Sequence, residues 1–287
     1  MLLAAGIRCL PAATVEPTHQ DVSYGPHEKQ KLNFWKIEAD KPAPLLVHIH
    51  GGGWLGGKKQ EKTSPNSLRQ GYNYCSIGYR LAGVKLLPAA VHDAARAVQF
   101  LRSKAEEWNI DPKRIAVTGG SAGAASSLWL AYHDDLADPD SQDPVLRYSS
   151  RVCGAIGMGG QTTLDPFLLE KSIGLAAIRH PMIWKTLGAK SHEHLMKNWD
   201  KYKELSIECS PMTHVSKDDP PVWISYGKPA PVPVINGDGI HHAGFGRLLK
   251  AKCENLSIEC YLRVAGGEQP AINNAEFIRR IFKLPEG

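Results

Sequence analysis

The sequence predicts an α/β fold in which a mostly parallel central sheet carries helices on both faces. Short apolar runs with β-branched residues alternate along the chain with longer segments of helical spacing, and this order is typical of a parallel sheet. Two of these runs, Leu45–His50 and Ile115–Thr118, lead directly into glycine-rich turns. Because parallel-sheet proteins bind ligands at the carboxyl ends of their strands, the two turns mark the candidate site.

The elements of this fold follow one another along the chain. An alternating pattern predicts an early antiparallel strand at Lys31–Glu38, and Pro42 and Pro44 separate it from the strand at Leu45–His50. Apolar residues at helical spacing predict a long helix over Ala89–Trp108. Further strands are expected at residues 74–79, 115–118, 152–158, 222–226 and 258–264, and further helices at residues 67–70, 124–132, 242–253 and 275–282.

Length and composition favour a single globular domain. The chain has 287 residues, of which 43% are hydrophobic and 22% charged, and its formal net charge is +5. These values argue against a disordered chain. No cluster of Lys and Arg is long, so a nucleic-acid partner is not expected. No apolar run approaches the roughly 18 residues that a membrane-spanning helix needs, so no membrane span is expected either.

Residues 115–132 have the order of a nucleophile elbow. Gly119–Gly123 matches the pattern G-x-S-x-G with Ser121 at its centre, and an Ala- and Leu-rich helix follows. Glycines allow the chain to turn where a Cβ atom would clash, and the helix N-terminus presents free N–H groups to a developing oxyanion. Ser121 is therefore the predicted nucleophile. The alternative is a Gly/Ser-rich loop without a chemical role.

A second motif ends the strand at Leu45–His50. The segment His50–Trp54 reads His-Gly-Gly-Gly-Trp, and an HGGG segment after a strand supplies a backbone N–H group to the oxyanion hole. The other donor comes from the residue after the nucleophile. The predicted oxyanion hole therefore consists of the N–H groups of Gly52 or Gly53 and of Ala122.

These motifs resemble those of the α/β-hydrolase superfamily, in its hormone-sensitive-lipase-like group and close to the bacterial carboxylesterase and feruloyl-esterase-like (BD-FAE-like) branch. The resemblance covers roughly residues 20–284 and rests on the segments Asp21–Gly25, His50–Trp54, Gly78–Leu81, Asp111–Gly123 and Pro220–Gly227. It implies an α/β-hydrolase fold and a serine carboxylesterase that hydrolyses small, short-acyl esters through an acyl-enzyme on Ser121. No cofactor and no metal are expected.

Residues 160–215 interrupt the alternation of strands and helices. In the family an insertion at this place caps the active site, whereas the alternative is a helical excursion that packs on the core. Together with Trp54 and Met158, this segment is expected to crowd the mouth of the site and to contact the substrate. His192 and His194 could suggest a metal, but no third ligand has motif spacing, so a solvated helix face is expected.

The residues that should activate Ser121 are absent from their usual places. The resemblance implies an acid after the strand that ends at Tyr226 and a histidine in the loop after the last strand. This chain has Lys228–Pro233 and Ala265–Pro270 there, and no histidine follows His242. Two explanations stay open: a catalytically impaired homologue that acts as a ligand-binding protein, or a rearranged site.

A rearranged site would draw on residues that reach the same edge of the sheet. His241 and His242 follow the strand that ends at Tyr226, and Glu268 follows the last strand. The hypothesis takes His242, or failing that His241, as the base, with Glu268 or Asp238 as the orienting acid, since a triad is defined by geometry rather than by chain order. The alternative role for the histidine pair is helix capping or simple surface exposure.

The predicted domain organisation is an N-terminal extension at residues 1–19 and a hydrolase domain at residues 20–287. Met1–Ala13 is mildly apolar, but it lacks a basic start and Arg8 interrupts it, so a cytoplasmic and an exported protein both stay open. The sequence also leaves open whether Cys253 and Cys260 pair, and it is compatible with a homodimer.

Overall fold

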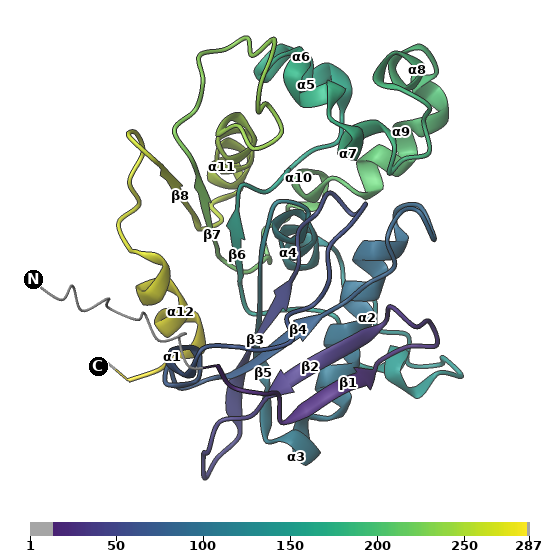
Figure 1. The fold of residues 1–287 in the computed structure, drawn as a ribbon. Helices are drawn as coiled ribbons and strands as arrows, with labels where there is room; N and C mark the ends of the chain where they lie inside the picture. The colour runs from purple at the N-terminus through teal and green to yellow at the C-terminus, as the bar shows by residue number, and fades with distance from the viewer. Residues whose placement is uncertain (1–13, 286–287) are drawn as a thin grey trace, which may run out of the picture.

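An eight-stranded sheet forms the centre of the structure, a computed structural model that describes residues 14–285 (Figure 1). Its strands are β1 (His19–Ser23), β2 (Lys31–Trp35), β3 (Ala43–Ile49), β4 (Asn73–Ile77), β5 (Ile110–Gly120), β6 (Ala155–Met158), β7 (Val222–Tyr226) and β8 (Cys260–Val264). The spatial order is β1-β2-β4-β3-β5-β6-β7-β8, with antiparallel pairing at β1–β2 and β2–β4 and parallel pairing elsewhere. The predicted fold class is therefore confirmed. The signal-like segment Met1–Ala13 lies outside the described residues.

Helices fill the connections after β3, and α12 follows the last strand. They are α1 (Pro65–Leu68), α2 (Ala89–Ser103), α3 (Ala105–Trp108), α4 (Ala122–Tyr132), the 3₁₀ helix η1 (Pro144–Arg147), α5 (Pro166–Ser172), α6 (Leu175–Arg179), α7 (Pro181–Trp184), α8 (His192–Lys197), α9 (Trp199–Glu208), α10 (Pro211–His214), α11 (Gly244–Leu256) and α12 (Asn274–Phe282). Each long helix follows a strand or precedes one, which is the connection that parallel pairing requires.

Two hydrophobic cores lie on opposite faces of the sheet. Along β3, Leu45, Val47 and Ile49 enter the larger core, which also holds buried residues of α2, α4 and α11. Leu46 enters the smaller core with Phe277 of α12. Successive side chains of a strand point to opposite faces, so a continuous apolar run is the pattern of a strand that is covered on both sides.

Several element bounds differ from those predicted, and three of the differences lie near the candidate site. The strand expected at residues 115–118 extends over Ile110–Gly120 and pairs on both sides, with β3 and β6. The long helix divides at Lys104 into α2 and α3. Helix α11 begins at Gly244 rather than at residue 242, because the His242 N–H closes a turn onto the Gly239 carbonyl (3.3 Å). The histidine pair therefore precedes the helix instead of opening it.

The interruption at residues 160–215 consists of the six short helices α5–α10, with no strand among the described residues there. Figure 1 shows α5, α6 and α7 gathered beyond the end of the sheet toward which the β6 arrow points. The insertion is bonded to the loop between β7 and α11: the Val234 N–H donates to the Ile173 carbonyl (2.7 Å), and the Ala176 N–H donates to the Val234 carbonyl (3.0 Å). The insertion and this loop therefore hold each other in place.

Two further expectations concern cysteines and the membrane. Cys253 and Cys260 are both buried and both carry free thiols, so they do not pair in this structure. Among the helices of residues 14–285, none combines the length and the apolar character that crossing a bilayer requires.

Candidate active site

Ser121 stands at the turn between β5 and α4. Its backbone angles are φ 53° and ψ −123°, a conformation that costs energy for a residue with a side chain, and its N–H donates to the Met158 carbonyl (2.8 Å). The outer glycines of the turn leave no room for side chains: a Cβ at Gly119 would lie 2.5 Å from Gly123, and a Cβ at Gly123 would overlap the Ile49 carbonyl oxygen. The turn therefore packs against the end of β3.

His241 joins Ser121 to Asp238. Its Nε2 lies 3.0 Å from the Ser121 Oγ, and its Nδ1 lies 3.0 Å and 2.9 Å from the two carboxylate oxygens of Asp238. Because a carboxylate only accepts hydrogen bonds, Nδ1 carries the proton and Nε2 presents its lone pair to the hydroxyl. The side chains of His241 and Asp238 are 42% and 64% exposed, so the arrangement opens to solvent.

The Asp238 carboxyl group is held in its ionised form. Burial raises its pKa, but the hydrogen bond and the charge of His241 outweigh burial, and His180 adds a smaller effect in the same direction. The pKa of Asp238 therefore lies below its ordinary value. An anion at this position keeps the imidazole proton on Nδ1 and stabilises an imidazolium when one forms.

Three residues outside the recognised motifs hold this loop. A Cβ at Gly239 would lie 2.5 Å from the backbone of α6, so the loop approaches the insertion closely. The side-chain amide of the buried Gln161 donates to the Ile240 carbonyl (2.7 Å). Gly159, with φ +61°, lies against the His241 ring, where a Cβ would stand 3.4 Å from the Cδ2 atom. No sequence signal marks these contacts, because they join segments far apart in the chain.

The structure does not bring His242 or Glu268 to Ser121. The His242 side chain is buried, with Nε2 at 2.9 Å from the Ala230 carbonyl, and its Nδ1 accepts the Gly244 N–H (3.0 Å). Both ring nitrogens are thus occupied by backbone groups. Glu268 forms an ion pair with Arg247 (2.6 Å). These contacts correct the first choice of base, His242, and exclude Glu268 as its acid. His241, the second choice of base, meets Ser121, and Asp238, the other candidate acid, pairs with His241.

The glycines after His50 pass close to the elbow. A Cβ at Gly51 would lie 2.7 Å from the Gly120 carbonyl oxygen, and Gly52 and Gly53 have φ values of +108° and +64°, which favour glycine. Ala122 is the first residue of α4, where an N–H group has no partner within the helix. The loop and the helix end therefore meet beside Ser121, as an oxyanion hole requires.

The two residues expected at the mouth differ in exposure. Met158 is 41% exposed at the end of β6 and lies at the surface beside the elbow. Trp54 is only 1% exposed, and its indole N–H donates to the Ser126 Oγ of α4 (2.9 Å). Trp54 therefore packs beneath the glycine loop instead of facing solvent. Met182 of α7 stands above this loop, 3.5 Å from the position of a Cβ at Gly53.

Comparison with known families gives one match that covers most of the chain. The family model described as BD-FAE matches residues 34–237. The matched segment includes the glycine loop, the elbow and β7, and it ends one residue before Asp238. The acid and histidine that meet Ser121 therefore lie just beyond it.

Two similar proteins come from Mycobacterium tuberculosis. The probable carboxylic ester hydrolase LipM is 28% identical over 217 residues, which are 72% of this chain and 47% of LipM. The carboxylesterase NlhH is 35% identical over 167 residues, which are 57% of this chain and 51% of NlhH. The chain thus spans about half the length of the curated relatives it matches.

Solved structures with the same fold cover nearly the whole chain. A truncated form of a carbohydrate esterase from gut microbiota has a TM-score of 0.67 at 19% identity and covers 95% of this chain and 94% of its own. The acetyl ester-xyloside bifunctional hydrolase from Caldicellulosiruptor lactoaceticus has a TM-score of 0.62 at 21% identity, covering 88% and 85%. At these identities the similarity shows a common fold.

Proposed function

The chain belongs to the BD-FAE family, and from this premise we propose that it is a serine carboxylesterase that hydrolyses small carboxylic esters. The hydrogen-bonded line from the Ser121 Oγ through His241 to Asp238 carries the proposal. The names of LipM and NlhH, a probable carboxylic ester hydrolase and a carboxylesterase, support the same reaction. The Ser121–His241–Asp238 hydrogen bonds also favour an active hydrolase over a homologue that only binds a ligand.

The reaction begins at the Ser121 hydroxyl. His241 Nε2 takes the hydroxyl proton while Oγ attacks the ester carbonyl carbon, and Asp238 stabilises the imidazolium. The tetrahedral intermediate expels the alcohol, which takes the proton from His241, and leaves an acyl group on Ser121. Water then attacks the acyl-enzyme with His241 again as base, and the carboxylic acid leaves. Atoms and protons balance over the two halves.

The negative oxygen of each tetrahedral intermediate needs donors. The N–H groups of Gly52 or Gly53 and of Ala122 are the proposed oxyanion hole, since the glycine loop and the start of α4 meet beside Ser121. Removing one such donor typically costs about 3–4 kcal/mol of transition-state stabilisation. Backbone geometry at the glycines therefore matters as much as the side chains of the triad.

We propose a preference for short acyl chains. Met182 packs directly on the glycine loop, where a Cβ at Gly53 would lie 3.5 Å from the Met182 Cβ, and Met158 lies beside the elbow. These methionines restrict the room next to the proposed oxyanion hole. The insertion that carries Met182 would thus act as a cap that limits the acyl group.

The nucleophile is tested by Ser121→Ala. We expect the parent to hydrolyse p-nitrophenyl acetate or butyrate and the variant to lose kcat/KM by about 10⁴-fold or more, because triad members act as a unit. Retained circular dichroism and thermal melting would show that the variant is folded. Equal rates for parent and variant would refute the serine mechanism, and a parent inactive on many esters would favour a binding protein.

The acyl preference is tested separately with p-nitrophenyl esters of increasing chain length. We expect kcat/KM to decrease from C4 to C16, and Met182→Ala to reduce that decrease because it opens space at the glycine loop. A kcat/KM that rises toward C16 in the parent would contradict the short-acyl proposal while leaving the serine mechanism intact.

A further inference from the structure

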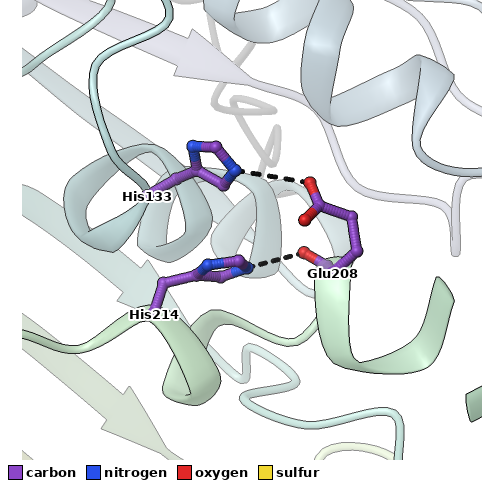
Figure 2. A group of neighbouring side chains, drawn as sticks. All are labelled: His133, Glu208 and His214. Carbon is purple, nitrogen blue, oxygen red and sulfur yellow. Dashed lines mark hydrogen bonds and ion pairs between the residues drawn. The ribbon is translucent and has the colours of Figure 1, made fainter. Parts of the chain in front are cut away.

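A second group of histidines lies at the opposite end of the helix that starts behind the nucleophile. His133 follows the last residue of α4, Glu208 ends α9, and His214 ends α10 (Figure 2). One possible ligand atom from each of the three lies within 4.8 Å of the other two. Helix α4 has 11 residues. At 1.5 Å per residue it separates the group from Ser121 by about 16 Å, so the group is not part of the esterase site.

The two ring nitrogens of His133 face different groups: Nδ1 faces a backbone carbonyl, and Nε2 faces the Glu208 carboxylate. Its Nδ1 lies 2.9 Å from the Asp134 carbonyl oxygen, and since a carbonyl only accepts, Nδ1 must carry the proton. In the neutral ring, Nε2 is then an acceptor that points at the Glu208 Oε1, 3.3 Å away. Two acceptors face each other unless a proton or a cation lies between them. A histidine that binds a metal through one ring nitrogen usually donates its other ring N–H to a carboxylate, a backbone carbonyl or water, as Nδ1 of His133 does here.

The separation of His133 and Glu208 is compatible with a cation held between them. Charge-assisted hydrogen bonds have lengths of about 2.7–2.9 Å, and the His241–Asp238 pair conforms to this at 2.9 Å. The separation of 3.3 Å between His133 and Glu208 is longer. Two ligand atoms of a tetrahedral metal site with bonds of about 2.0–2.1 Å lie about 3.3 Å apart, which is the same separation.

His214 lies beside the same point. Its Nε2 lies 2.7 Å from the Glu208 backbone carbonyl, but the Trp129 indole N–H donates to that carbonyl as well, also at 2.7 Å. If His214 bound a metal, the carbonyl would therefore keep a hydrogen-bond donor. His92 of α2 is the next candidate, with its Nε2 3.8 Å from the Glu208 Oε1.

We propose that His133, Glu208 and His214 form a structural site for a divalent transition-metal cation of the zinc type, with His92 or water as the fourth ligand. A site of two imidazoles and a carboxylate binds Zn²⁺ in preference to Ca²⁺ or Mg²⁺, because those two ions prefer oxygen ligands. The negative ends of α4 and α9 converge there and favour a cation. Side-chain exposures of 15% for His133 and 37% for Glu208 admit an ion from solvent. The cation would clamp the insertion to the nucleophile helix.

The test measures Zn²⁺ binding to the chelator-treated, dialysed protein by calorimetry, with the thermal midpoint as a second readout. We expect one Zn²⁺ per chain and a rise in Tm with Zn²⁺ concentration, because a ligand that binds only the folded state stabilises it. The His133→Ala, His214→Ala and Glu208→Gln variants should each weaken binding by about 100-fold or more, given that outer partners alone contribute 10–100-fold. Tetrahedral ligand-field absorption of bound Co²⁺ should disappear in the same variants.

Two controls separate this site from other histidines. The His192→Ala variant removes a histidine of the insertion that pairs with Glu193 (3.0 Å), and His241→Ala removes the proposed catalytic base; both should bind Zn²⁺ with the affinity of the parent. The proposal is overturned if the parent binds no Zn²⁺, or if His133→Ala and His214→Ala bind it as tightly as the parent. Loss of binding in His241→Ala would also overturn it, since the ion would then lie at the esterase site.

Discussion

Two loops leave the same edge of the sheet from neighbouring strands, yet only one reaches the nucleophile. The loop between β7 and α11 brings Asp238 and His241 to Ser121, and it is packed against α6 so closely that a Cβ at Gly239 would meet the helix backbone at 2.5 Å. The loop between β8 and α12 holds Glu268 in an ion pair with Arg247 (2.6 Å), and a Cβ at Gly266 would meet nothing within 4 Å.

Packing around a loop decides whether the loop can hold a catalytic base. The first loop is fixed by backbone bonds to the insertion, by Gln161 and by the contact of Gly159 with the His241 ring. A base must hold its position within hydrogen-bond distance of the nucleophile, which requires such packing. The second loop is exposed and carries a surface ion pair, a contact of small energetic value. Substitutions in the two loops test this difference.

The largest effect is expected at His241. We expect His241→Ala to lower kcat/KM for p-nitrophenyl butyrate by about 10⁴-fold or more, because the loss of the base disables the whole triad. Glu268→Gln, in the other loop, should stay within about threefold of the parent, since its side chain pairs with an exposed arginine at the surface. Steady-state kinetics on both variants give the comparison. A large loss of kcat/KM in Glu268→Gln, or no loss in His241→Ala, would contradict the roles assigned to the two loops.

The next effect is expected for Asp238→Asn, a loss of about 10⁴-fold in kcat, because the amide keeps the shape of the carboxylate but neither its charge nor the imidazole tautomer that it imposes. The pKa of Asp238 is lowered, so the parent carboxylate stays ionised as the pH falls from 8 to 5, and the parent should remain the faster enzyme over that window. Equal kcat values for the parent and the variant within this pH window would argue against Asp238 as the orienting acid.

The smallest effect tests the support of the loop rather than its chemistry. Gly239→Ala places a methyl group against the backbone of α6 and should lower kcat by about tenfold, since small displacements of catalytic groups are costly. Gly227→Ala lies at the start of the same loop, where a Cβ meets nothing within 4 Å, and is the matched control. Equal kcat values for the two variants would show that α6 does not position His241.

Local chemistry in the sequence determined the nucleophile half of the site. A β-branched strand followed by Gly119–Gly123 predicts a turn, and the turn's glycines are required because Cβ atoms there would meet β3 and α4. The glycine loop after His50 follows the same rule. Each motif is contiguous in the chain. The glycines that allow the turn and the groups proposed to react or to bind the oxyanion therefore appear together in the sequence.

Only the tertiary structure decided between His241 and His242. The two residues are adjacent on a turn, and one ring is buried against Ala230 and Gly244 while the other meets Ser121, 120 positions away in the chain. The group of His133, Glu208 and His214 likewise has no spacing that a motif could reveal. In both cases the orientation of a side chain depends on packing between distant segments, and the residue types alone carry no information about that packing.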